Sequence, residues 1–213
     1  MTGTTEEKPF DRRIRMLRQL NLTCMACTMC ELGRKDAVKG DIVRDPHVFS
    51  NMNPKRFVIV GQNPGWEELK LRQPFVGQSG KNFDDELSKN GLSRDDLYIT
   101  NTVRCFITDN AKPSGLHNAR CKPFLNMEMA LIRPLLVATL GSVAYYAMFR
   151  RGNFQESLGK MCYSDELDVY VYPLYHPSPL NLSDPGRRKA FTHQMTIFCK
   201  MIKKLQKADH SAL

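Results

Sequence analysis

The chain has 213 residues, enough for one domain with a buried core. Its 31 lysine and arginine residues outnumber 22 aspartate and glutamate residues, and the resulting net charge of +9 favours a polyanionic partner. There is no apolar run long enough to span a membrane and no signal-peptide pattern. We therefore expect an intracellular monomer without membrane contact, whose seven cysteines stay reduced and form no disulfide framework.

Apolar runs and helical patterns alternate along the chain. Residues 11–20 carry apolar side chains three positions apart, which predicts a first helix. Four short apolar runs predict buried strands at residues 57–60, 97–100, 135–140 and 169–172. Further helices are predicted at residues 79–90, 116–132, 142–149 and 185–206. Since no repeat or linker divides the chain, we expect one domain over residues 12–207 with flexible tails at residues 1–11 and 208–213.

The alternation of strands and helices predicts a three-layer α/β/α domain around a mainly parallel, four-stranded sheet. In such sheets ligands bind at the carboxyl ends of the strands. Gln62 and Asn63 follow the first predicted strand and Asn101 follows the second. Gly141 follows the third and His176 the fourth. These residues are therefore expected to meet at one edge of the sheet.

Two pairs of cysteines lie far apart in the chain. Cys27 and Cys30 are separated by two residues, and Cys105 and Cys121 by fifteen. In a reducing compartment, two such pairs predict one four-thiolate metal site that ties the N-terminal segment to the middle of the fold. The spacing leaves zinc and a [4Fe-4S] cluster both open.

The remaining cysteines admit other roles. Cys24 could replace Cys27 as a metal ligand. The spacing of Cys24, Cys27 and the next cysteine also opens the bacterial ferredoxin run, but Arg34 stands where that run needs its fourth cysteine, so a ferredoxin-like electron carrier is not expected. Cys162 precedes a predicted strand and Cys199 has apolar neighbours in the last predicted helix, so both are interpreted as core thiols.

Six motifs follow one another between residue 27 and the last predicted helix. They are Cys-x2-Cys-Glu-Leu at 27–32, Gly-Gln-Asn-Pro-Gly at 61–65, Gln-Pro-Phe-Val-Gly-Gln-Ser-Gly at 73–80, Tyr-Ile-Thr-Asn-Thr-Val-Arg-Cys at 98–105, Cys-Lys-Pro-Phe-Leu at 121–125 and His-Pro-Ser-Pro-Leu at 176–180. In this order they resemble the iron–sulfur uracil-DNA glycosylases, often called family 4. The resemblance implies a monofunctional DNA glycosylase that excises uracil or a related modified base and leaves an abasic site. It also implies a [4Fe-4S] cluster with these ligands: Cys27, Cys30, Cys105 and Cys121.

Excision from DNA requires the nucleotide to flip into a pocket that supplies an aromatic face, an amide and a hydrogen-bond donor. The resemblance assigns the aromatic face to Phe75, on which the family stacks uracil. Asn101 can pair its amide with uracil O4 and N3–H. His176 can donate a hydrogen bond to O2 as negative charge builds on the departing base. Gly61 and Gly65 complete the expected base-binding residues.

The first loop departs from the family pattern. The iron–sulfur enzymes usually read Gly-Glu-x-Pro-Gly, and Gln62 stands here in place of the glutamate. The classical enzymes have aspartate at the third position, whereas Asn63 resembles the mismatch and single-strand-selective glycosylases. Because a neutral amide can position water without taking its proton, we expect Gln62 or Asn63 to place the water, with Glu67 or Glu68 as the alternative. Trp66 either shapes the pocket or packs.

The last motif resembles the classical uracil-DNA glycosylases more than the His-Pro-Ala form frequent in the iron–sulfur group. Its two prolines fix φ, so that the loop around Ser178 can present backbone N–H groups to a phosphate and Leu180 can wedge into the vacated stack. Arg187 and Arg188 are expected to contact the DNA backbone. With no lysine evidently placed for a Schiff base, strand cleavage is not expected. A rival hypothesis, supported by Gln62, is a catalytically weak DNA-binding module that senses uracil or a modified base.

Overall fold

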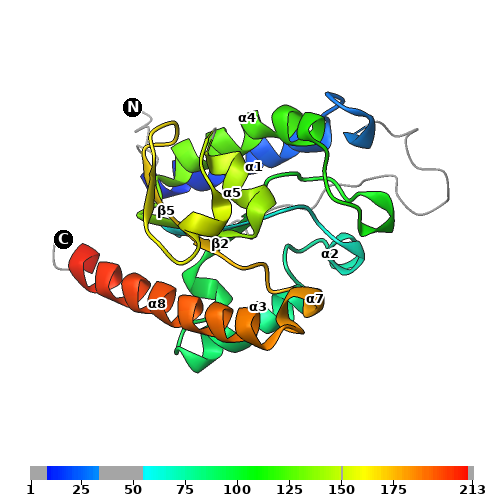
Figure 1. Cartoon of the computed structure of the whole chain (residues 1–213). Coiled ribbons are helices and arrows are strands. Elements are labelled where there is room, and N and C mark those ends of the chain that lie inside the picture. The colour runs from blue at the N-terminus through cyan, green and yellow to red at the C-terminus, as the bar shows by residue number, and fades with distance from the viewer. Residues whose placement is uncertain (1–8, 34–54, 150, 211–213) are drawn as a thin grey trace, which may run out of the picture.

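A computed structural model describes residues 9–33, 55–149 and 151–210 (Figure 1). Its centre is a five-stranded sheet in the order β2-β1-β3-β5-β4. The strands are β1 (Phe57–Gly61), β2 (Tyr98–Asn101), β3 (Leu136–Leu140), β4 (Cys162–Ser164) and β5 (Val169–Leu174). β1 pairs in parallel with β2 and β3, and β3 pairs in parallel with β5, whereas β4 is antiparallel to β5.

Helices cover both faces of the sheet (Figure 1). One face carries α1 (Pro9–Met25), α4 (Gly115–Ile132) and α5 (Ser142–Met148), and the other carries α3 (Gln78–Lys89) and α8 (Pro185–His210). Three short helices lie in the connections: α2 (Trp66–Leu71), α6 (Phe154–Ser157) and α7 (Pro179–Leu182). Within the part of the chain that the structure describes, no helix combines the length and apolar character needed to span a bilayer.

The strands alternate their side chains between two apolar layers, as the pleat requires. Ile59 and Ile99 pack in the layer that contains α3 and α8. Val58, Val60 and Tyr98 pack in the layer that contains α1, α4 and α5. Burial on both faces explains why these strands read as continuous apolar runs in the sequence.

The four predicted strands all occur close to their expected bounds, but the sheet has five strands and not the four expected. β4 adds an antiparallel edge strand in which Tyr163 pairs with Tyr170. At three residues, β4 is too short to produce a recognisable alternating pattern. The interpretation of Cys162 as a core thiol is wrong, since it lies partly exposed on this edge strand, whereas Cys199 is 1% exposed in the core.

The helices extend beyond several of their expected ends. The expected tails at residues 1–8 and 211–213 lie outside the described residues, while residues 9–11 and 208–210 belong to α1 and α8. α1 continues past residue 20 with Cys24 on its buried side. α2, α6 and α7 were not predicted, because helices of four to six residues are shorter than the repeat that a hydrophobic pattern needs.

Candidate active site at the carboxyl edge of the sheet

The ends of β1 and β2 bring three of the expected site residues together. Gly61 and Asn101 are partners in the parallel register. A Cβ atom at Gly61 would overlap both the Phe75 ring and Asn101 Oδ1. Because glycine has no Cβ, the ring and the amide can approach one another directly above the end of β1.

Asn101 presents a buried acceptor to this space. The residue is 2% exposed, and its Oδ1 has no hydrogen-bond partner among the described residues. A buried polar atom without a partner costs about 1–3 kcal/mol, so native structures retain one chiefly where a ligand completes the bond. An acceptor at this position matches the N3–H of uracil.

The Phe75 ring is held in place by its loop. Phe75 has a φ of 55°, which a bulky residue rarely adopts. The Phe75 carbonyl packs so closely against Gly80 that a Cβ there would overlap it, and Arg94 Nη1 holds the loop by donating to Pro74 O at 2.9 Å. The ring lies 6.3 Å from the Phe83 ring and 6.2 Å from the His176 ring, measured between centroids.

Glu68 connects the two loops of the site. Its Oε2 accepts the backbone N–H of Gly65 at 2.9 Å, and its Oε1 accepts those of Val76 at 2.9 Å and Gly77 at 2.7 Å. The Glu68 carboxylate is thereby occupied in tying the first loop to the loop of Phe75. This contact, which sequence reasoning missed, favours a positioning role for Glu68 over that of a base. Glu67 is exposed.

Gln62 and Asn63 form a short chain of amides beside the Gly61–Asn101 pair. Gln62 Nε2 donates to Asn63 Oδ1 at 2.9 Å, and Asn63 Nδ2 donates to Pro64 O at 3.1 Å. The backbone carbonyl of Gln62 accepts a hydrogen bond of 2.7 Å from the hydroxyl of Thr102, which directly follows β2. Since an amide oxygen has two lone pairs, Asn63 Oδ1 retains one with which to accept a hydrogen bond from water.

His176 follows the end of β5, and its ring lies beside that of Phe75. Its carbonyl accepts Asn181 Nδ2 at 3.1 Å, and Asn82 Nδ2 donates to Pro177 O at 2.9 Å. Burial lowers the pKa of His176 from 6.5 to about 4, with Glu68 opposing this shift and Lys112 adding to it. The imidazole is therefore neutral at pH 7 and keeps one N–H to donate. Gly141 packs against its Cβ.

Five cysteines from three segments of the chain lie near one another. Cys24, Cys30, Cys105 and Cys121 are buried, and Cys27 is partly exposed. Electrostatic interactions link Cys105 to all four others. Burial raises the pKa of Cys24 to about 12 and also raises those of Cys105 and Cys121. The two distant pairs expected from the sequence therefore lie close enough to interact electrostatically, and their role as metal ligands stays a prediction.

A second contact holds the same segments together. Glu31, next to Cys30, lies with its Oε1 2.6 Å from His117 Nε2, and His117 is one helical turn before Cys121 on α4. Among the described residues, no group of three or more His, Cys, Asp or Glu side chains is arranged to hold a metal ion. A buried group of thiols is nonetheless the donor set that soft metals and iron–sulfur clusters take. The residues therefore fit such a group in their donor chemistry.

Arg104 adds a buried positive charge next to the thiols. It is 3% exposed and forms an ion pair with Glu128, which is 1% exposed and also accepts from the hydroxyls of Tyr98 at 2.8 Å and Thr100 at 2.9 Å. The Arg104 backbone N–H donates to Cys121 Sγ, and its charge opposes the raised pKa of Cys24. Sequence reasoning missed this pair, since its members are 24 positions apart.

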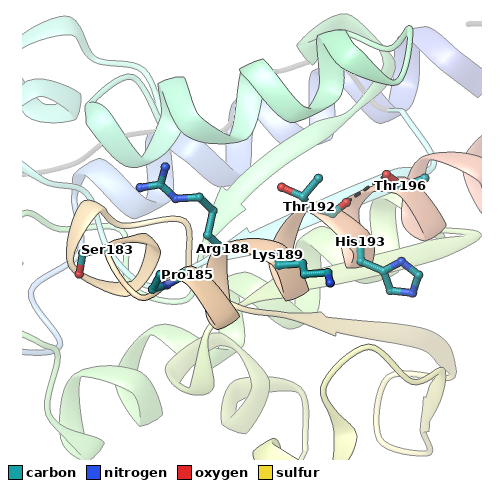
Figure 2. A pocket seen from close by; sticks show the side chains of 7 residues that line it. All are labelled: Ser183, Pro185, Arg188, Lys189, Thr192, His193 and Thr196. Carbon is teal, nitrogen blue, oxygen red and sulfur yellow. Dashed lines mark hydrogen bonds between the residues drawn. The ribbon is translucent and has the colours of Figure 1, made fainter.

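The residues expected to contact DNA lie on α7 and α8. Ser178 caps α7, with its Oγ accepting the Asn181 N–H at 3.3 Å, and Leu180 is 82% exposed. The backbone N–H of Arg187 donates to Asp184, and Arg188 Nε donates to Leu182 O at 2.8 Å. A groove of about 720 Å³ lies along the first half of α8. Figure 2 shows its lining side chains, which are hydroxyl-bearing, cationic or imidazole-bearing apart from one proline: Ser183, Pro185, Arg188, Lys189, Thr192, His193 and Thr196.

The lowered pKa of His176 can be tested by titration. Its protonation should occur near pH 4 in the folded protein, so imidazole NMR signals assigned with a His176→Gln variant should not titrate between about pH 8 and about pH 5. The unfolded chain binds this proton near pH 6.5, so His176 should make folding less stable as the pH falls from 6.5 to about 4. A His176 pKa at the ordinary value would contradict this shift.

Comparison with known proteins connects this geometry to a family. The model of the Uracil DNA glycosylase superfamily matches residues 48–198, which include β1 to α7 and most of α8. The type-4 uracil-DNA glycosylase of Thermotoga maritima is 35% identical, over 78% of this chain and 82% of that protein. The type-4 enzyme of Saccharolobus solfataricus is 31% identical over 76% of each chain, and that of Pyrobaculum aerophilum is 29% identical over 85% and 92%.

Proposed function

Since the chain belongs to the uracil-DNA glycosylase superfamily, we propose that it is a monofunctional glycosylase that hydrolyses the N-glycosidic bond of deoxyuridine in DNA and leaves an abasic site. The observation that carries this proposal is the buried, unpaired Oδ1 of Asn101 beside the Phe75 ring. It supplies an acceptor and an aromatic surface together, at the sheet edge where such folds bind ligands.

Recognition of the base follows from hydrogen-bond chemistry. The target nucleotide leaves the stack and its uracil lies against Phe75. Asn101 accepts from N3–H through Oδ1 and donates to O4 through Nδ2. Cytosine carries an acceptor at N3 and a donor at N4, so that it would meet the same amide with both bonds reversed. Asn101 therefore selects uracil by mismatching cytosine.

Bond cleavage leaves negative charge on the uracil, chiefly at O2 and N1. The neutral imidazole of His176 donates its N–H to O2 as this charge develops. Because the interaction strengthens only in the transition state, it accelerates the reaction without tightening ground-state binding. A neutral donor also avoids holding the product anion in a strong ion pair.

The sugar that remains has oxocarbenium character and needs only a weak nucleophile. Asn63, oriented by Gln62, accepts a hydrogen bond from water and directs the water to C1′. The Glu68 carboxylate accepts three backbone N–H groups and acts by fixing the loops. Neutral amides in place of a carboxylate suit a reaction in which water need not lose its proton early.

The thiols form the second part of the proposal. Cys27, Cys30, Cys105 and Cys121 would hold a [4Fe-4S] cluster, which when bound supplies a covalent link between the end of α1, the segment after β2 and α4. Cys105 lies four residues after Asn101, so this link fixes the segment that carries the base-reading amide. Arg104 offsets part of the negative charge that deprotonated thiols bring into a buried region.

DNA contact is proposed for the end of the molecule that carries α7. The loop around Ser178 meets a phosphate beside the flipped nucleotide, and Leu180 enters the space that the base vacates. Arg187 and Arg188 contact the backbone, and the groove of Figure 2 extends the polar surface along α8. The weak DNA-binding module remains the second candidate, supported by Gln62 in place of a glutamate, and excision assays separate the two.

His176→Ala should lower single-turnover excision of uracil by roughly 100-fold to 1000-fold, as expected for loss of one donor to a developing anion. Binding to undamaged DNA should change little. Asn101→Asp should lose uracil excision and gain some tolerance of cytosine, because a carboxylate offers O4 no donor. Abasic-site formation in oligonucleotides containing one uracil or one cytosine measures both.

Asn153→Asp is the matched control for the amide change. Asn153 is exposed and caps α6 through Oδ1, a cap that aspartate provides equally well, so the change removes only the exposed hydrogen bond from Nδ2 to Glu156. This variant should excise uracil at the parent rate. Unchanged uracil excision by His176→Ala or Asn101→Asp would place the pocket elsewhere, and a parent protein that excises no uracil would favour the binding module.

The purified protein should contain about four iron atoms per chain and absorb broadly in the visible range, as a cubane cluster does. Cys105→Ala and Cys27→Ala should lose the iron, whereas Cys24→Ala and Cys162→Ala should keep it. Metal analysis by mass spectrometry decides the outcome. Stoichiometric zinc would refute the iron assignment, and iron retained by Cys27→Ala but lost by Cys24→Ala would move the ligand to Cys24.

A further inference from the structure

Two aromatic residues occupy equivalent positions beyond the paired ends of β1 and β2. Gly61 and Asn101 are register partners, and the parallel ladder continues, because Val103 N–H donates to Gln62 O at 3.0 Å. Trp66 lies five residues after Gly61, and Phe106 lies five residues after Asn101. Both residues therefore follow closely after the strand ends that carry Gly61 and Asn101.

The two rings contact each other directly. Their centroids are 5.9 Å apart and their planes meet at 62°, an edge-to-face arrangement. The residue before each ring is held in place. Gly65 donates its N–H to Glu68, and Cys105 is buried at 4% exposure. Trp66 is nevertheless 41% exposed. The pair is thus a supported aromatic surface open to solvent beside the site.

A second exposed edge-to-face pair shows what ordinary packing looks like in this protein. Tyr163 and Tyr170 lie 5.2 Å apart at 61°, and they are cross-strand partners of β4 and β5. Sheet register alone brings these two rings together. No strand pairing relates Trp66 to Phe106 within the described residues, so sheet packing does not account for their meeting at the carboxyl edge.

The surroundings favour nucleic acid as the partner of this surface. The chain carries a net charge of +9, and Lys112, on the connection that follows Phe106, lies close enough to His176 for the two groups to interact electrostatically. Removing a nucleotide from a stack also exposes the face of the next base. Every base has a π-face, and stacking on an aromatic side chain contributes about 1–3 kcal/mol per base in single-stranded DNA.

We propose that Trp66, supported by Phe106, is a stacking platform for an unpaired DNA base that adjoins the flipped nucleotide. The inference rests on the proposed function for the identity of the flipped nucleotide, but not for the stacking itself. In duplex DNA the adjoining base stays paired and stacked on its own strand. The platform therefore strengthens binding to single-stranded DNA in preference to duplex DNA.

The sequence allows a direct test, because Trp66 is the single tryptophan of the chain. Stacking of a base on indole quenches its fluorescence, so titration with a single-stranded oligonucleotide carrying one hydrolysis-resistant 2′-fluoro-deoxyuridine should quench the signal. Replacing the adjoining nucleotide with an abasic analogue on each side in turn should abolish most of the quenching on one side. Unchanged fluorescence in all titrations would overturn the proposal.

The affinity of Trp66 variants for DNA provides a second test of the platform. Trp66→Ala should weaken binding of the single-stranded oligonucleotide by about 5-fold to 100-fold, while Trp66→Phe should retain most of it. Tyr170→Ala, which removes a ring from the other exposed pair, should bind as the parent does. Single-stranded binding by Trp66→Ala at the parent affinity, or an equal loss on duplex DNA, would overturn the platform.

Uracil excision by the parent protein keeps the two proposals separate. Excision without quenching would remove the platform and leave the glycosylase function intact. Quenching and a Trp66→Ala defect without excision would support the platform and remove the glycosylase function.

Discussion

The absence of a side chain at Gly61, opposite Asn101, is the constraint on which the site depends. A Cβ there would occupy the space in which the Phe75 ring and the Asn101 amide meet. The ring can use this space because its loop is held in a rarely adopted conformation, and the Glu68 carboxylate ties that loop to the first one. In the proposed function, base stacking by Phe75, base reading by Asn101 and the placement of water by the first loop are therefore coupled through a few buried contacts.

A second coupling runs along β2 and its continuation. This segment carries Asn101, then the buried ion pair partner Arg104, then Cys105 among the gathered thiols. A buried ion pair rarely adds stability over apolar packing, but breaking one is strongly destabilising because it leaves a charge unpaired. Arg104 and Glu128, with two hydroxyls on the carboxylate, thus join β2 and its continuation to α4. One segment after β2 therefore connects the Asn101 amide to the thiols.

The features that could be predicted from the sequence are those carried by short contiguous segments. β1, β2, β3 and β5 are buried on both faces and read as apolar runs, and the rule that ligands bind at strand ends placed Asn101 and His176 at one edge of the sheet. Sequence reasoning did not find the Glu68 contacts or the Arg104–Glu128 pair, because they join backbone or side chains across loops and between elements. β4 and the helices of four to six residues are too short to show a recognisable pattern of apolar and polar residues. The roles of the site residues remain predictions.

The most direct measurement is a crystal structure of the protein with free uracil. The account predicts that the base lies against Phe75, that Asn101 Oδ1 accepts its N3–H, and that His176 lies within hydrogen-bond distance of O2. Because the Asn101 acceptor is already buried and preformed, β1 and β2 should not move. Uracil bound away from the Gly61–Asn101 pair, for example in the groove along α8, or an Asn101 amide turned toward a protein partner, would contradict the account.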